Sequence, residues 1–146
     1  MKKLLSLMTV LLMFILVGCS SGDSSNSKSL IGEWERIDTS SPLYGMIVKV
    51  EESSDGYVGK ITYLTDVAKD ADFKTGMTKW KDINLTETKN QYEFKDFTIN
   101  ALDGEESWSD MIMIFDPAKP DEIKIHSVSD ETNFMSSNDQ TYRRVK

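Results

Sequence analysis

Apolar and polar residues alternate in short runs from residue 30 to the end of the chain. Such alternation is typical of β-strands that bury one face. The clearest instance is a hairpin in which 44–51 and 57–64 flank the turn Ser53-Ser54-Asp55-Gly56. The glycine supplies the positive φ angle that tight hairpin turns favour. The whole pattern predicts eight strands, at 30–38, 44–51, 57–64, 80–88, 91–100, 107–115, 122–128 and 141–146.

Three segments depart from simple alternation. Residues 65–79 are mostly polar and predict a long loop or a short helix, the kind of excursion that often carries function. Within 91–100 the apolar residues change face halfway along, which predicts a bulge or a sharp bend. Residues 111–115 are apolar on both faces, so this strand is covered on both sides or faces a cavity. The fold expected is all-β, an antiparallel up-and-down barrel or strongly curved sheet of about eight strands.

The first 19 residues follow a different pattern. Lys2 and Lys3 precede a mostly apolar run of 14 residues, 4–17. This length fits the core of a secretion signal and falls short of the ~20 residues that span a bilayer. Residues 16–19, Leu-Val-Gly-Cys, resemble the lipobox of bacterial lipoproteins. The resemblance implies that the signal is cleaved before Cys19 and that the Cys19 thiol carries lipid, a palmitate-type anchor.

Three regions follow from this interpretation. Residues 1–18 are predicted to be the signal peptide, 19–29 the lipidated cysteine with a flexible polar tether, and 30–146 one β domain. Two or three acyl chains make anchoring effectively permanent. The expected location is the cell envelope, on the outer face of the cytoplasmic membrane, or on the outer membrane if the host has two membranes.

Cysteine count and charge narrow the possible partners. Cys19 is the only cysteine of the chain, so a disulfide framework and a cysteine metal site are excluded. Removing Lys2 and Lys3 from the 17 basic residues leaves 15 against 24 acidic ones, a formal charge of −9. Such a charge argues against nucleic acid and against electrostatic docking on anionic lipid. Contact with a membrane is therefore expected through Cys19 alone.

Gly32-Glu33-Trp34, at the start of the predicted domain, resembles the Gly-x-Trp motif of lipocalins and related calycin barrels. The resemblance implies that Trp34 lies at the closed end of the barrel. It also implies that a basic residue of the last strand, Arg143 or Arg144, packs over the Trp34 ring. A guanidinium over an indole face gains about 0.5–2 kcal/mol. Gly32, Trp34, Arg143 and Arg144 would then be structural residues of a lipocalin-like barrel.

Catalytic signatures are weak. His126 is the only histidine, and it is expected on the solvent face of 122–128. One histidine without cysteine disfavours a zinc site, and no Gly-x-Ser-x-Gly motif is present. Asp66, Asp70 and Asp72 are spaced for a cation, but they lack the glycine and distal glutamate of an EF-hand loop. The sequence therefore predicts no enzyme, no metal and no cofactor.

An apolar surplus favours ligand binding, because Met and aromatic side chains adapt to irregular apolar ligands. The leading hypothesis is a lipid-anchored binding module for a small apolar or amphipathic molecule. The alternatives are an interaction or structural envelope lipoprotein with a filled core that works through rim loops such as 65–79, and, third, a hydrolase that uses surface carboxylates. The candidate ligand-binding residues are Tyr44, Met46, Tyr63, Trp80, Phe94, Trp108, Met111 and Met113.

Overall fold

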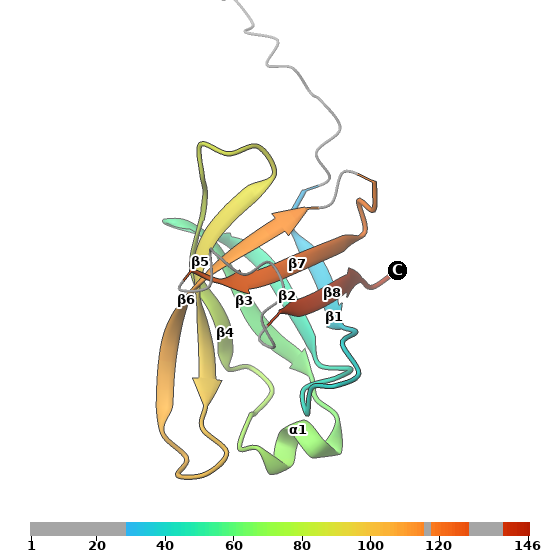
Figure 1. Cartoon of the computed structure of the whole chain (residues 1–146), viewed down its shortest axis with the longest axis vertical. Coiled ribbons are helices and arrows are strands. Elements are labelled where there is room, and N and C mark those ends of the chain that lie inside the picture. The colour runs from blue at the N-terminus through green and yellow to red at the C-terminus, as the bar shows by residue number, and fades with distance from the viewer. Residues whose placement is uncertain (1–28, 116–117, 129–138) are drawn as a thin grey trace, which may run out of the picture.

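Eight antiparallel strands form a closed barrel in sequence order, as predicted, with β1 paired to both β2 and β8 (Figure 1). The computed structural model describes residues 29–115, 118–128 and 139–146. The elements are β1 (Gly32–Arg36), β2 (Ile47–Ser53), β3 (Gly56–Tyr63), α1 (Asp66–Asp70), β4 (Thr78–Leu85), β5 (Gln91–Ile99), β6 (Glu106–Phe115), β7 (Glu122–Ser127) and β8 (Gln140–Arg144).

The barrel has two different ends. Because successive strands run in opposite directions, alternate connections meet at the same end. The connection 37–46, α1 and the β5–β6 turn lie at the lower end in Figure 1, which we call the mouth. The start of β1 and the β4–β5 turn lie at the upper end, which we call the base. Segment 65–79, expected to be a loop or short helix, contains α1, whose N-cap Thr65 hydroxyl accepts from the Ala68 N–H.

Trp34 and Arg144 close the base. Trp34 is fully buried, its indole nitrogen donates to the Leu30 carbonyl at 2.9 Å, and the Arg144 guanidinium lies 4.3 Å from the centre of its ring. The neighbouring Gly32 has a φ of +140°, and a Cβ there would lie 2.6 Å from Arg144 Nη1. The glycine of the Gly-x-Trp motif therefore leaves room for the arginine that stacks on the tryptophan. Arg143, the other candidate for this contact, is exposed.

Replacing Arg144 by alanine should lower the free energy of unfolding by about 1–2 kcal/mol, because the stacking contact is lost together with two hydrogen bonds to the Ser29 and Ile31 carbonyls. Urea denaturation measures this change. The matched control is Arg143→Ala on the same strand, where a change within about 0.5 kcal/mol is expected. Equal losses in the two variants would contradict a role for the Trp34 contact.

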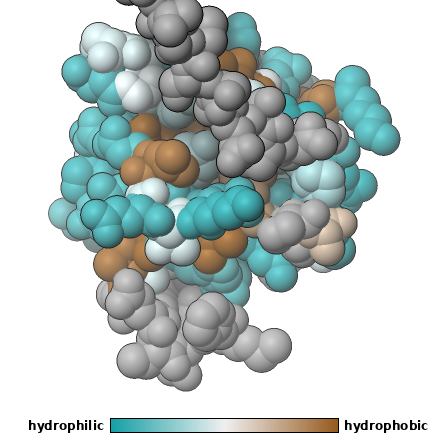
Figure 2. Space-filling model, turned by 90° about the horizontal axis from the view of Figure 1, so that it is seen from above, coloured by the Kyte–Doolittle hydropathy of each residue, from teal (hydrophilic) through white to brown (hydrophobic). Residues whose placement is uncertain are grey.

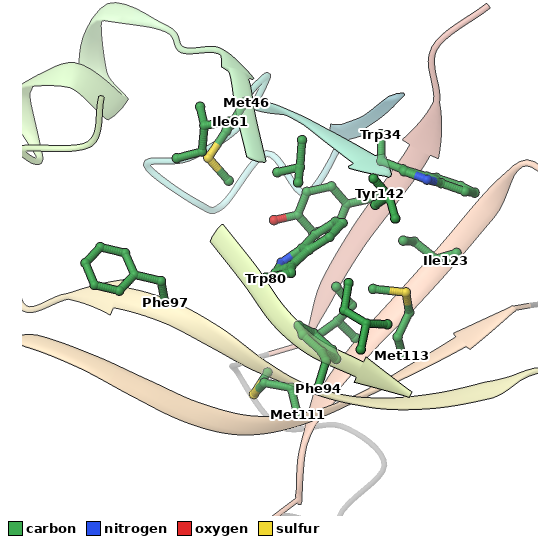
Figure 3. Close-up of a cluster of buried hydrophobic side chains, with 14 of the residues drawn as sticks. Trp34, Met46, Ile61, Trp80, Phe94, Phe97, Met111, Met113, Ile123 and Tyr142 are labelled. Atoms are coloured by element: carbon green, nitrogen blue, oxygen red, sulfur yellow. The ribbon is translucent and has the colours of Figure 1, made fainter. Parts of the chain in front are cut away.

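Packed side chains fill the middle of the barrel (Figure 3). Trp80 lies at the centre, with ring centroids 4.9 Å from Tyr142 and 5.9 Å from Phe94, both in edge-to-face arrangement. Gly59 permits this packing, because a Cβ there would lie 2.8 Å from the Trp80 ring and 2.9 Å from Val48. Apolar contact therefore runs without interruption from the base to the level of Trp80.

Of the bulge or sharp bend predicted within 91–100, the bulge is absent from β5. β5 keeps an unbroken register with β6, and the extra residue lies instead in β4, between Lys81 and Asn84. The apolar residues change face for another reason. Phe97 points out of the barrel and is covered by Phe73 and Trp108, at ring centroid distances of 6.1 and 5.1 Å. Toward the mouth, the inner face of β5 carries the polar residues Asp96 and Thr98 in place of apolar ones, because the interior becomes polar there.

Candidate functional site

A pocket of about 410 Å³ lies at the mouth, between the ends of β1, β5, β6, β7 and β8. Its wall is largely polar, with Met111 and Pro42 as apolar members. The hydroxyl side chains in the wall are Ser40, Ser41, Thr98, Ser109 and Ser127. The charged side chains are Arg36, Asp38, Asp96 and Asp139, and Gln140 completes the polar set. The volume falls within the range usual for small-molecule sites, roughly 300–1,000 Å³.

A buried ion pair, Lys79–Asp96, lies behind the pocket wall. Lys79 is fully buried, and its ammonium donates to Asp96 Oδ1 and to the Phe97 carbonyl, each at 2.5 Å. Lys79 reaches the interior because it is an extra residue in β4, where Gly59 pairs with Trp80 and Lys60 with Thr78. Burial lowers the pKa of Lys79 from its ordinary value, and the charge of Asp96 opposes this effect. Each charge of this pair therefore depends on the other.

The network continues from Asp96 to the core. Asp96 Oδ2 accepts from Gln140 Nε2 at 3.0 Å, and Gln140 Oε1 accepts from the Tyr142 hydroxyl at 3.2 Å. Burial raises the pKa of Tyr142 far above its usual range, so the hydroxyl stays protonated and can donate. Figure 3 shows the Tyr142 oxygen and the Trp80 nitrogen at adjoining ends of the two rings. The apolar half of the interior ends here and the polar half begins.

Arg36 and Asp38 form the β1 side of the pocket. Arg36 Nε donates to both carboxylate oxygens of Asp38, at 2.9 and 3.0 Å. Asp38 Oδ1 also accepts from the Thr141 N–H at 3.2 Å, which ties β1 to β8 at the mouth. The Arg36 guanidinium lies 5.9 Å from the centre of the Tyr142 ring. The pair is therefore held on two sides, and its position in the pocket is fixed.

The eight predicted ligand-binding residues do not line one cavity. Met46, Trp80, Phe94 and Met113 are buried in the packed core, whereas Met111 lies in the pocket wall. Tyr44, Tyr63 and Trp108 lie outside the barrel, with 48%, 54% and 37% of their surface exposed. Tyr63 was expected inside, but a register shift opposite Ile47 and Val48 reverses the face it occupies.

Sequence reasoning missed the residues that make the site polar. Arg36 is in phase with Trp34, Asp96 with Phe94, and Gln140 with Tyr142. Each of the three is a polar residue on the otherwise apolar face of its strand, and all three lie toward the mouth end. This pattern could have revealed the polar pocket from the sequence. Lys79 gave no such signal, since only the bulge in β4 turns it inward.

The other candidate groups stand apart from this network. His126 Nδ1 lies 2.7 Å from Asp139 Oδ1 near the pocket rim, so the histidine is half-buried, not solvent-facing. Asp66 pairs with Lys69 at 2.9 Å on the surface of α1. Within the described residues, no group of three or more His, Cys, Asp or Glu side chains is placed to hold a metal ion.

The predicted signal peptide, Cys19 and the tether up to residue 28 lie outside the described residues. In the part of the chain that the structure describes, no helix is long and apolar enough to span a membrane. Comparisons with family models, with curated proteins and with solved structures found no match. Fold and pocket alone define the class, a closed eight-stranded antiparallel barrel with a polar pocket at one end.

Proposed function

We propose that this chain is a non-enzymatic binding protein of the cell envelope, a lipocalin-like barrel that holds a small molecule in the mouth pocket. The observation that supports this proposal is the pocket itself, about 410 Å³ in volume and lined by side chains from five strands. Pockets of this size with convergent polar groups are the usual sites of small ligands. The pocket also occupies one end of a barrel whose middle is filled, so bound molecules would enter from the mouth.

The pocket favours a polar ligand over the apolar ligand that the sequence suggested. The apolar side chains of the interior pack on one another, whereas hydroxyl, carboxylate and guanidinium groups line the pocket. Apolar surface gains little from contact with such a wall, because the polar groups would lose their hydration without gaining hydrogen bonds. We therefore assign the ligand to small polar molecules.

Lipid anchoring through Cys19 completes the proposal. Arg144 Nη2 donates to the Ser29 carbonyl at 2.6 Å, so the tether joins the barrel at the base. Seen from this end, the surface is mostly hydrophilic, with hydrophobic residues between polar side chains (Figure 2). A lipid on Cys19 would hold the base toward the membrane and leave the mouth facing away from it.

Native mass spectrometry of the mature protein purified from its own host tests the binding proposal. We expect a fraction of the protein to carry a noncovalently bound small molecule. The variant Ser109→Leu, which fills the pocket from β6 without touching the Arg36–Asp38 pair, should lack this mass. A protein without a bound molecule, together with no response to small polar ligands in solution, would overturn the proposal.

A second candidate function is interaction with another protein through the rim of the mouth. The exposed rings of Tyr44 and Tyr63, close to the ends of β2 and β3, favour it. Such aromatic side chains are enriched at protein interfaces. Binding of a partner that is lost in the double variant Tyr44→Ala/Tyr63→Ala, but retained in Ser109→Leu, would support this function over ligand binding.

A further inference from the structure

Arg36 presents unused hydrogen-bond donors to the pocket. Its Nε is bound by Asp38, which fixes the plane of the guanidinium. Apart from the nearby phenol of Tyr142, Nη1 and Nη2 find no acceptor within the described residues, although Arg36 is only 9% exposed. A guanidinium carries five N–H donors, and in Arg36, which lines the pocket, the carboxylate of Asp38 engages only the Nε donor. This end of Arg36 is therefore suited to an oxygen-bearing group in the pocket.

The carboxylates of the pocket already have donors. Asp38 accepts from Arg36 and from the Thr141 N–H, and Asp96 accepts from Lys79 and Gln140. Asp139 Oδ1 lies 2.7 Å from His126 Nδ1. The outer nitrogens of Arg36, unlike these carboxylates, remain open to a ligand, so the pocket is suited to a ligand group that accepts hydrogen bonds. Two outer guanidinium nitrogens in a fixed plane match the two oxygens of a carboxylate.

The charge of the pocket restricts the rest of the ligand. Arg36 and Lys79 face Asp38, Asp96 and Asp139, which leaves a formal charge of −1 when His126 is neutral. A simple anion would be repelled by this excess of negative charge. A ligand whose carboxylate is balanced by its own positive group avoids that cost. The Ser109 hydroxyl lies in the same wall and suits an ammonium donor, and the negative charge of the neighbouring Asp96 favours a positive group there.

We infer that the ligand is a small zwitterion of the amino-acid type, an inference that rests on the proposed function. Its carboxylate pairs with the outer nitrogens of Arg36. Its ammonium group faces the Ser109 hydroxyl on β6, next to the negative charge of Asp96 on β5. No aromatic ring lines the described pocket, and an aromatic face for stacking is what a sugar ring would use. The pocket thus favours the zwitterion over a neutral polyol.

Isothermal titration calorimetry on the mature full-length protein in detergent tests this inference. The probes are L-glutamine, succinate, putrescine and D-glucose, at about pH 8. We expect L-glutamine to bind more tightly than the other three. Arg36→Lys should weaken its binding about tenfold or more, since lysine lacks the two-pronged geometry. Arg143→Lys is the matched control on the exposed face of β8, and its affinity should equal that of the unaltered protein.

Ser109→Leu keeps the inference falsifiable if Arg36→Lys fails to fold, because it blocks the pocket and preserves the Arg36–Asp38 pair. Tighter binding of succinate, putrescine or D-glucose, abolished by Ser109→Leu, would overturn the zwitterion and leave the binding function intact. Binding of L-glutamine that neither variant weakens would also overturn the inference. If none of the four probes binds, the zwitterion is excluded, and native mass spectrometry then decides whether the pocket holds any ligand.

Discussion

Replacing Asp96 by alanine is expected to lower the free energy of unfolding by about 3–5 kcal/mol, as measured by urea denaturation. Lys79 is fully buried, and its ammonium is bound only by Asp96 and the Phe97 carbonyl among the described residues. Removing the carboxylate leaves a positive charge in the interior without a counter-charge. Gln140 loses its acceptor at the same time. Tryptophan fluorescence can follow the transition, because Trp80 pairs directly with Asp96 across the two strands.

Asp110→Ala is the matched control. Asp110 accepts from Lys95 at 2.6 Å, but this pair lies on the surface, with 69% of the Asp110 side chain exposed. Exposed ion pairs contribute about 0–1 kcal/mol, so the control should lose no more than that. Similar losses in the two variants would show that the Lys79–Asp96 pair is not the source of the effect.

The pH dependence of Asp96→Asn provides an independent check. Burial lowers the pKa of Lys79, and Asp96 is the main group that opposes this effect. Without that charge the folded protein binds a proton at Lys79 less readily than the unfolded chain does. Stability therefore increases with pH wherever the unfolded chain carries the extra proton, up to the ordinary lysine pKa of 10.5. A variant whose stability is constant from about pH 7 to 10 would contradict this account.

The strands were predictable because a two-residue period leaves a direct trace in the sequence. The strand predicted at 91–100 corresponds to β5, Gln91–Ile99, and the strand predicted at 107–115 corresponds to β6, Glu106–Phe115. The turn at Ser53-Gly56 and the closure of β8 on β1 follow from the same pattern. The stacking of a last-strand arginine on Trp34 also agrees with what the Gly-x-Trp motif implied.

The pocket was not predictable in the same way, because it depends on where the barrel places residues from distant strands. A single extra residue in β4 turns Lys79 inward, and another shift turns Tyr63 outward. Alternation predicts which residues share a face, but a bulge reverses the faces beyond it. Asp96 illustrates a second reason. Its buried partner Lys79 lies 17 residues away in β4, so the alternation within one strand gives no sign of the ion pair.

Replacing Cys19 by alanine is expected to abolish lipid attachment and to move the protein from the membrane pellet into the soluble or secreted fraction. The proposed anchor consists of acyl chains, each contributing about 0.8 kcal/mol per buried methylene. Nothing else proposed here would hold the protein to a membrane, since a chain cleaved before Cys19 would carry a formal charge of −9, which opposes contact with anionic lipid. At the base of the barrel, the described residues visible in Figure 2 are mostly hydrophilic, although Ile31, Leu85 and Val145 are exposed there.

Two measurements make this expectation specific. The intact mass of the unaltered protein should exceed that of residues 19–146 by its acyl groups, and Cys19→Ala should lack this excess. Because an uncleaved signal would itself retain the protein, a second variant carries an ordinary cleavable secretion signal in place of residues 1–19. Ser20→Ala, beside the cysteine, is the control and should remain in the pellet with its lipid. If the second variant still sediments with membranes after a high-salt wash, the membrane contact resides in the barrel and the proposed role of Cys19 is wrong.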